Sequence, residues 1–338
     1  MPADVQACRV AIAGATSLLG KELKELLEDV TFPAAEIRLL DEDIAAGTLT
    51  EAGGEPAVIQ EVDEESFERM RFVFFAGTPA FAARHWEAAQ RAGATVIDLS
   101  GGLADLPCAL RWIPALDKLL PPAAPQAAGA RLFLSPAAPT IAACSLAAAL
   151  GGFAIERLAM VFFQPASERG QAGIEELESQ TLKLLSFQPI AQEVFGAQVA
   201  FNLLDRYGEE SAERLSDTRA NIAREVRGYL AGRAIVPAIQ LIQAPVFYSH
   251  VFTAYAELAS PAEPADLQPL FEAAGVKALS PADPAPSNLS VAGETRLVLG
   301  QVERDPNVER AYWFWGAADN LRLPAANAIS IAEKLLAV

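Results

Sequence analysis

The chain has few of the residues from which metal centres and disulfide frameworks are built. Its 338 residues include three cysteines and two histidines. Cys8, Cys108 and Cys144 lie far apart in the sequence, and neither they nor His85 and His250 show a metal-ligand spacing. We therefore expect reduced thiols, no metal site and a cytoplasmic location.

Positive charge is also scarce. Lysine and arginine number 26 against 43 aspartate and glutamate residues, which gives a formal net charge of −17 at pH 7. No basic stripe offsets this excess, so nucleic acid and anionic membranes are poor partners. The first residues, Met1–Val5, lack a basic segment followed by an apolar stretch, and we do not expect export.

The uncharged run 132–155 is long enough to raise the question of a membrane span. Its prolines and glycines, Pro136, Pro139, Gly151 and Gly152, divide it into a strand, a turn and an alanine-rich helix of about 11 residues, too short to cross a bilayer. With 52% hydrophobic residues the chain can bury a large core, and its length predicts two domains.

The segment from Val10 to Lys21, VAIAGATSLLGK, is the first to indicate a function. A short apolar strand leads into a glycine-containing turn and then a helical pattern, as at the start of a Rossmann unit. The turn needs Gly14 for its tight backbone and Gly20 for close packing of helix on strand, and the helix N-terminus offers N–H groups to a pyrophosphate. Ser17 replaces the middle glycine of the fingerprint.

Asp41 strengthens this interpretation. It ends the next apolar run, about 20 residues after the last glycine, where an acid accepts a hydrogen bond from a ribose 2′-hydroxyl. Strand and helix patterns then alternate, which predicts a parallel sheet. The expected elements are strands at 9–13, 36–41, 72–77 and 95–99 and helices at 21–28 and 80–92.

The pattern changes after a proline-rich connector at 119–125. Several strands follow one another there, which favours an antiparallel or mixed sheet. The expected elements are a strand at 131–134, the alanine-rich helix, strands at 158–164, 234–245 and 250–258, helices at 173–185 and 218–230, and a closing helix within 320–336.

A set of motifs is spread over nearly the whole chain: GATSLLG at 14–20, Phe32-Pro33 followed by EIRLL at 36–40, Ile97-Asp98, Gln164 with Ser167 and GQAGIEEL at 170–177, and ADNLR at 318–322. In their order and spacing these motifs resemble aspartate-β-semialdehyde dehydrogenase. Within that family, two segments resemble the Usg-type paralogues: QAPVFYSH at 243–250 and FNLL at 201–204.

The resemblance implies an α/β architecture of two domains. A Rossmann-type NAD(P)-binding domain is expected at 1–133, and an α+β dimerisation and substrate domain of the semialdehyde dehydrogenase type at 134–318. A last helix, 319–338, is expected to pack back on the first domain. The resemblance further implies a homodimer.

The family's chemistry needs a residue that this chain lacks. Its dehydrogenases reduce aspartyl phosphate through a thioester on a cysteine at a helix N-terminus. The corresponding turn is SPAAPT at 135–140, and the nucleophile position is Ala138, which has no lone pair for attack. Cys144, six residues further on, is interpreted as a small core residue.

Of the family's other catalytic and substrate-binding residues, this chain retains some and has replaced others. Gln164 matches the glutamine that orients the acyl intermediate, and His250 matches the general acid/base. Two interpretations are open: Gln164 and His250 still take part in catalysis, or they are a buried amide and a hydrogen-bonded core imidazole with structural roles. The arginine that clamps the substrate carboxylate corresponds to Gln243, the phosphate-side lysine to Asn221, and a further arginine to Ala104. Loss of these cations, at about 2 kcal/mol or more each, removes recognition of a phosphorylated dicarboxylate.

The cofactor positions differ as well. NADP-using members have serine and arginine after the second strand, where this chain has Asp41, Glu42 and Asp43, whose carboxylates repel a 2′-phosphate. The family resemblance thus implies NADP as the cofactor, whereas Asp41 favours NAD. Long side chains at Glu168 and Arg169 replace small ones beside the nicotinamide. The expected cofactor contacts are Gly14, Thr16, Ser17, Leu18, Leu19, Asp41, Asp319 and Asn320.

Two functions remain open. One is a non-catalytic family member that keeps the fold and the dimer and binds a protein or a metabolite. The alternative is an NAD(P)-dependent oxidoreductase acting on an aldehyde or acyl substrate, as in amino-acid biosynthesis, with Gln164 and His250 as its remaining catalytic groups. Whether the chain is an enzyme stays undecided at this level.

Overall fold

The computed structural model divides into two compact units. It describes residues 7–29, 32–42, 47, 49–52, 55–63, 65–120, 130–280 and 282–337. Unit 1 contains the chain up to Pro114, a segment that ends at Pro136 and the chain from Pro324 onwards. Unit 2 contains Ala137–Leu323 and a short segment that starts at Ala115. Most of the expected connector, and Asp43, lie outside the described residues.

Unit 1 is built on a parallel sheet in the order β5-β2-β1-β6-β7-β9-β8. After β1 the chain forms β2 on one side of β1 and later returns to form β6 on the other side. Ligands of open α/β sheets bind at such a switch point. The strands are β1 (Cys8–Ala13), β2 (Ala34–Asp41), β5 (Gln60–Glu61), β6 (Phe72–Phe75), β7 (Thr95–Asp98), β8 (Leu110–Arg111) and β9 (Leu132–Leu134), and β3 (Leu49–Ala52) pairs with β4 (Glu55–Val58) in a separate hairpin.

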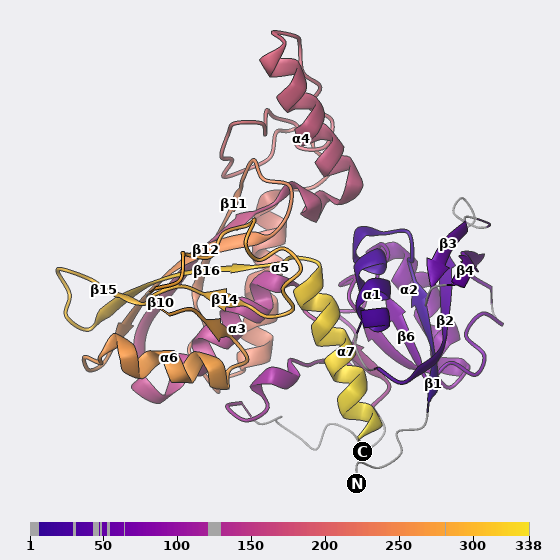
Figure 1. Cartoon of the computed structure of the whole chain (residues 1–338), viewed down its shortest axis with the longest axis horizontal. Coiled ribbons are helices and arrows are strands. Elements are labelled where there is room, and N and C mark those ends of the chain that lie inside the picture. Colours follow the sequence, from indigo (N-terminus) through magenta and orange to yellow (C-terminus); the bar gives the residue numbers. More distant parts are fainter. Residues whose placement is uncertain are drawn as a thin grey trace. The chain divides into compact units, whose positions relative to one another are not determined.

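Helices cover both faces of this sheet. Alternate residues of β1 point to opposite faces: Val10 and Ile12 pack with α1 (Leu18–Asp29) and the C-terminal helix α7 (Arg322–Leu336). Ala11 and Ala13 pack on the other face with α2 (Pro79–Arg91), whose first turn is capped by Thr78. Figure 1 shows α1 and α2 beside the strands. The predicted Rossmann-type fold is confirmed.

Unit 2 contains a mixed sheet in the order β11-β10-β12-β16-β14-β13. β10 pairs in parallel with β11 and antiparallel with β12, which in turn pairs antiparallel with β16. The strands are β10 (Ile155–Gln164), β11 (Ala238–Gln243), β12 (His250–Leu258), β13 (Lys277–Ala278), β14 (Val298–Leu299), β15 (Glu303–Arg304) and β16 (Ala311–Ala318).

The helices of unit 2 differ in their surroundings. α3 (Ala138–Leu150) contacts β10, α5 (Leu215–Leu230) contacts β11, and α6 (Pro264–Ala273) contacts β13. α4 (Gly170–Leu185) extends away from this sheet (Figure 1). Every residue of α3 is buried, including Cys144, as expected for a core cysteine. Among the described residues, no helix is long and apolar enough to span a membrane.

Candidate functional site

The glycine turn after β1 is shaped for close backbone approach. Gly14 has φ +94°, and a Cβ there would lie 2.2 Å from the backbone nitrogen of Gly77. Ser17 accepts a hydrogen bond from the Gly20 N–H (2.8 Å) and donates one to the Ala76 carbonyl (2.8 Å). Ser17 thereby caps α1.

Two amides remain for a ligand at this turn. Leu18 and Leu19 are the first two residues of α1, so their N–H groups have no acceptor within the helix. A helix N-terminus of this kind binds phosphate through its amides and dipole. The geometry therefore fits the pyrophosphate contact that the sequence predicted at Leu18 and Leu19.

Asp41, at the end of β2, is hydrogen-bonded to the glycine turn. Its Oδ2 accepts hydrogen bonds from the backbone N–H (2.7 Å) and the hydroxyl (2.6 Å) of Thr16. Its Oδ1 accepts one from the Glu42 N–H (2.9 Å). Because each carboxylate oxygen has two lone pairs, Oδ1 keeps room for one more donor, such as a ribose hydroxyl.

A pocket of about 510 Å³ lies beside Asp41 in unit 1. Arg84 pairs with Glu42 at its rim, and the His85 ring lies 4.8 Å from the Phe81 ring. Burial, with the charge of Arg84, lowers the pKa of His85 although Glu42 opposes the shift, so the imidazole is neutral at pH 7. The lining residues are Asp41, Glu42, Glu61, Val62, Phe81, Arg84 and His85. One guanidinium thus faces three carboxyl groups.

Unit 2 holds a buried amide network at the ends of two paired strands. Gln164 ends β10 opposite Gln243, which ends β11. Gln164 Nε2 donates to the Tyr207 hydroxyl (2.9 Å), which donates to Gln243 Oε1 (2.9 Å). Burial raises the pKa of Tyr207 to about 12, with a further increase from the charge of Glu168, against the effects of Arg169 and Gln164. The phenol is therefore protonated at neutral pH.

Gln243 is fully buried and its amide is occupied at both ends. Its Nε2 donates to the carbonyls of Gln164 and Ala244, both at 3.0 Å, while its Oε1 accepts from Tyr207. The residue at the expected arginine position therefore holds strands together. As placed, it offers no donor to a substrate carboxylate.

His250 contacts the carboxylate of Glu168, a pairing that the sequence did not predict. It begins β12, is 1% exposed, and places Nε2 3.1 Å from Oε1 of Glu168. Asn320 donates from Nδ2 to the same oxygen (3.0 Å). Burial alone would raise the pKa of Glu168, but the hydrogen bond and charge of His250, with the Asn320 hydrogen bond, hold it below its usual range. Glu168 is therefore ionised at neutral pH.

Asp319 serves as a helix cap. Its Oδ1 accepts hydrogen bonds from the N–H groups of Leu321 (3.0 Å) and Arg322 (2.9 Å), at the start of α7. Its Oδ2 accepts one from Gly293 (3.0 Å). These contacts give Asp319 a structural role, and its predicted contact with a cofactor remains a prediction.

The predicted nucleophile and clamp positions carry no reactive or cationic group. Ala138 is buried at the first turn of α3, which contacts β10. Asn221 is exposed on α5 and accepts a hydrogen bond from Arg224 (3.1 Å). Ala104 lies in unit 1 among partly buried core residues. Gln164 is hydrogen-bonded to Gln243, and Glu168 links His250 to Asn320.

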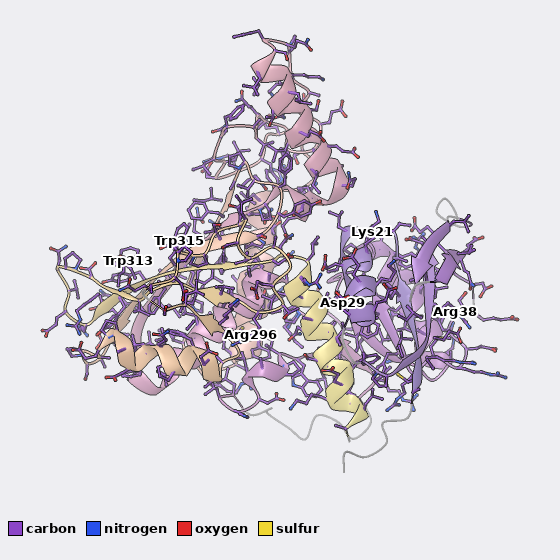
Figure 2. The ribbon with its side chains drawn as sticks, viewed as in Figure 1. Lys21, Asp29, Arg38, Arg296, Trp313 and Trp315 are labelled. Carbon is purple, nitrogen blue, oxygen red and sulfur yellow. The ribbon has the colours of Figure 1, made fainter. Side chains whose placement is uncertain are left out.

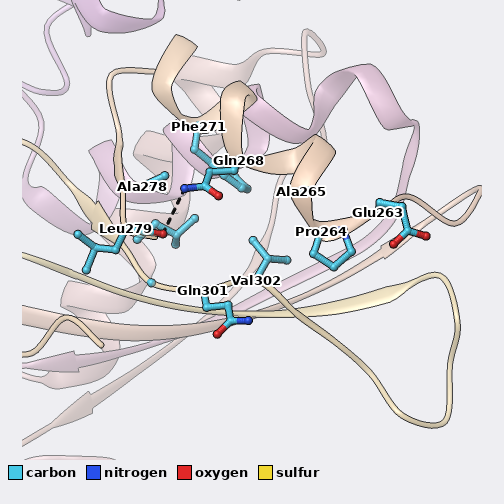
Figure 3. Close-up of a pocket in the computed structure, with 11 residues that line it drawn as sticks. Glu263, Pro264, Ala265, Gln268, Phe271, Ala278, Leu279, Gln301 and Val302 are labelled. Carbon is cyan, nitrogen blue, oxygen red and sulfur yellow. Dashed lines mark hydrogen bonds between the residues drawn. The ribbon is translucent and has the colours of Figure 1, made fainter. Parts of the chain in front are cut away.

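A second cavity of about 320 Å³ lies elsewhere in unit 2 (Figure 3). It is lined mainly by apolar side chains of α6 and β14, including Phe271 and Leu299, and Gln268 donates to the Leu279 carbonyl (3.2 Å). None of the predicted site residues lines it. Within the described part of the chain, no group of three or more His, Cys, Asp or Glu side chains could hold a metal ion.

A parallel-sheet unit with a glycine turn after β1, followed by a mixed-sheet unit, is the architecture of semialdehyde dehydrogenase-like proteins. Residues 9–110 match the family model "Semialdehyde dehydrogenase, NAD binding domain", and residues 146–323 match "Semialdehyde dehydrogenase, dimerisation domain". The chain belongs to the semialdehyde dehydrogenase family, as a member of the Usg type, which confirms the sequence prediction.

Individual relatives are similar over their full length. A USG-1 protein homolog of Pseudomonas aeruginosa is 30% identical over 336 residues, with 98% of each chain covered. A solved structure of a probable aspartate-semialdehyde dehydrogenase from Pseudomonas aeruginosa has a TM-score of 0.84, 29% identity and 98% coverage of each chain. That of aspartate semialdehyde dehydrogenase II from Vibrio cholerae has a TM-score of 0.84, 25% identity and the same coverage.

Proposed function

We propose that the protein is a dinucleotide-binding, homodimeric family member that does not carry out thioester chemistry and that acts by binding a partner or metabolite. The observation that carries this proposal is the methyl group of Ala138 at the first turn of α3, where the family places a nucleophile. A dipole-activated thiolate is needed there for covalent attack, and alanine supplies none. The test is an assay of the purified protein with aspartate semialdehyde, phosphate and either dinucleotide, in which no turnover is expected.

The buried state of Gln243 supports the proposal independently. A carboxylate-binding arginine acts through a bidentate pair of N–H groups aimed at the substrate. The Gln243 amide is instead engaged by Gln164, Tyr207 and Ala244. The strand ends that would hold a substrate are therefore used to stabilise the fold.

We expect the protein to bind NAD at least tenfold more tightly than NADP, a difference of roughly 1.4 kcal/mol. The pocket beside Asp41 holds three carboxyl groups, its imidazole is neutral, and its guanidinium, Arg84, is already paired with Glu42. A 2′-phosphate entering this pocket meets uncompensated negative charge. Isothermal titration calorimetry with both dinucleotides measures the ratio.

Glu42→Ala should reduce the preference for NAD over NADP, because it removes one carboxylate and releases Arg84 for the 2′-phosphate. Glu36→Ala is the matched control: Glu36 pairs with Arg9 and Arg38 and does not line the pocket. Equal or tighter binding of NADP by the unmodified protein would show that this interpretation of the pocket is mistaken.

The open face of the unit 2 sheet supports the homodimer. Phe162 and Phe314 are buried on one face, while Thr253 of β12 stands in register between Val161 and Trp315 on the other. Trp313 and Trp315 are 42% and 40% exposed on β16 (Figure 2). Clusters of exposed large apolar side chains mark interaction surfaces, and the matched family model is a dimerisation domain.

Thr253→Arg is expected to raise the dimer dissociation constant at least 30-fold. The substitution puts a long charged side chain between Val161 and Trp315 on this face, and an interfacial change at a central position costs about 2 kcal/mol or more. Sedimentation velocity over a concentration series measures it, with Leu49→Arg as the control at a 75% exposed position of unit 1. A wild-type monomer at micromolar concentration, or a Thr253→Arg dimer of unchanged affinity, would contradict the assignment.

A further inference from the structure

Two buried donors of unit 2 converge on a single carboxylate oxygen. His250 Nε2 and Asn320 Nδ2 lie 3.1 and 3.0 Å from Oε1 of Glu168. The His250 and Asn320 side chains are almost fully buried, at 1% and 4% exposure. Charge-assisted hydrogen bonds of this kind are stronger than neutral ones. The arrangement has the chemistry of a carboxylate-binding site whose occupant belongs to the same chain.

The donors are held in place independently of Glu168. His250 is the first residue of β12 and pairs with Ala318 of β16, so its backbone is part of the sheet. Asn320 Oδ1 accepts a hydrogen bond from the Ser249 N–H (2.9 Å) and contacts the Ser167 hydroxyl (3.3 Å). Donors fixed in this way stay in position when their acceptor is exchanged.

The acceptor side chain is more exposed than the two donors. Glu168 lies in the short 3₁₀ turn Ala166–Arg169, and its side chain is 25% exposed. The turn ends at Gly170, which has φ +65° and open space where a Cβ would be. The neighbouring Arg169 is paired with Glu213, so it does not hold Glu168 in the site. Rotation of the Glu168 side chain towards solvent would uncover both donors.

We propose that His250 and Asn320 form a binding site for a small monocarboxylate, which the chain fills with its own Glu168 and which a free carboxylate enters when Glu168 turns outward. A carboxylate fits better than phosphate, because the site has at most one positive charge, on His250, to oppose the charge of its ligand. The proposal is independent of dinucleotide binding, and its test contains no nucleotide.

The two histidines of the chain provide the reporter and its internal control. The carbon-bound ring protons of His250 are followed by NMR during titration with sodium acetate, at constant pH and with chloride balancing the ionic strength. In Glu168→Ala we expect saturable shifts of the His250 signals with a Kd on the order of 10 mM. The unmodified protein should bind acetate at least tenfold more weakly, since its own carboxylate competes. His85, in unit 1, should not shift in either protein.

Further variants separate occupancy from other effects of the substitution. Glu168→Gln leaves a neutral amide in the site, which competes less well than a carboxylate, so its acetate affinity should lie between the other two. Glu175→Ala, on the exposed surface of α4, should titrate like the unmodified protein. Replacing acetate by inorganic phosphate should give Glu168→Ala no saturable His250 shift.

The proposal is overturned if acetate leaves His250 unchanged in folded Glu168→Ala, or shifts it equally in all variants. Phosphate binding as tight as acetate binding would also overturn it, because the site would then select charge rather than a carboxylate. Should Glu168→Ala not fold, the comparison of Glu168→Gln with the unmodified protein still decides, since equal acetate affinities in those two proteins contradict the competition.

Discussion

Purified protein is expected not to interconvert aspartyl phosphate and aspartate semialdehyde with either dinucleotide. The reaction of the family requires a thioester, and the position that would carry its sulfur is Ala138. Loss of a covalent nucleophile alone lowers kcat by about a millionfold in other nucleophilic enzymes. A coupled spectrophotometric assay at micromolar protein measures this, with a catalytically active family member as the positive control.

Ala138→Cys should leave the protein inactive. The new thiol would stand at the start of α3, but Gln243, Asn221 and Ala104 still replace the three cations by which the resemblance expects substrate to be held. A nucleophile without a positioned substrate loses the effective concentration on which attack depends. The combined replacement of Ala138 and the three clamp positions is the only variant from which trace activity is expected.

The opposite outcome would identify an enzyme. Steady NAD(P)-linked turnover by the unmodified protein, abolished by His250→Ala, would contradict the proposed function and favour an oxidoreductase acting on an aldehyde or acyl substrate. Ala138→Ser is a useful companion variant, because a hydroxyl at the same place changes polarity without supplying a thiolate. Turnover that survives His250→Ala would instead indicate a contaminating dehydrogenase.

Elements with a clear period could be predicted from the sequence. The strand expected at 250–258 matches β12 (His250–Leu258), and α1 and α2 lie where the glycine turn and the alternating pattern put them. Helix α6 was not predicted, and its Pro269 explains why: proline inside a helical pattern normally ends a helix. Strand β16 was missed although AYWFWGAA alternates, with Trp313 and Trp315 exposed between buried neighbours.

The candidate site could be predicted only in part. Gln164 and His250 were identified by position, but their partners are far along the chain: 43 residues separate Gln164 from Tyr207, and 82 separate His250 from Glu168. A single sequence contains no signal for such contacts. Glu168 in particular was predicted only as a long side chain beside the nicotinamide, whereas its carboxylate is hydrogen-bonded to His250 and Asn320 inside unit 2.

A large loss of stability is expected from Gln243→Arg, the substitution that restores the arginine by which the family holds its substrate carboxylate. Gln243 is fully buried, and its amide both donates to the carbonyls of Gln164 and Ala244 and accepts from Tyr207. None of the groups that hydrogen-bond to Gln243 carries a negative charge, since Tyr207, with a pKa of about 12, stays neutral. The carboxylate that acts on Tyr207, that of Glu168, is already engaged by His250 and Asn320. A buried charge without a counter-charge costs several kcal/mol, so the free energy of unfolding should fall by about 4 kcal/mol.

Urea denaturation followed by circular dichroism measures this loss, with Ala238→Arg as the matched control. Ala238 lies on the same strand, β11, but is exposed, so the same side chain there should change stability by no more than about 0.5 kcal/mol. A Gln243→Arg protein as stable as the control would mean that the strand ends open to solvent or to an anion. Gln243 would then face a ligand site, and the loss of the clamp would be a change of substrate preference instead of a change in how the fold is stabilised.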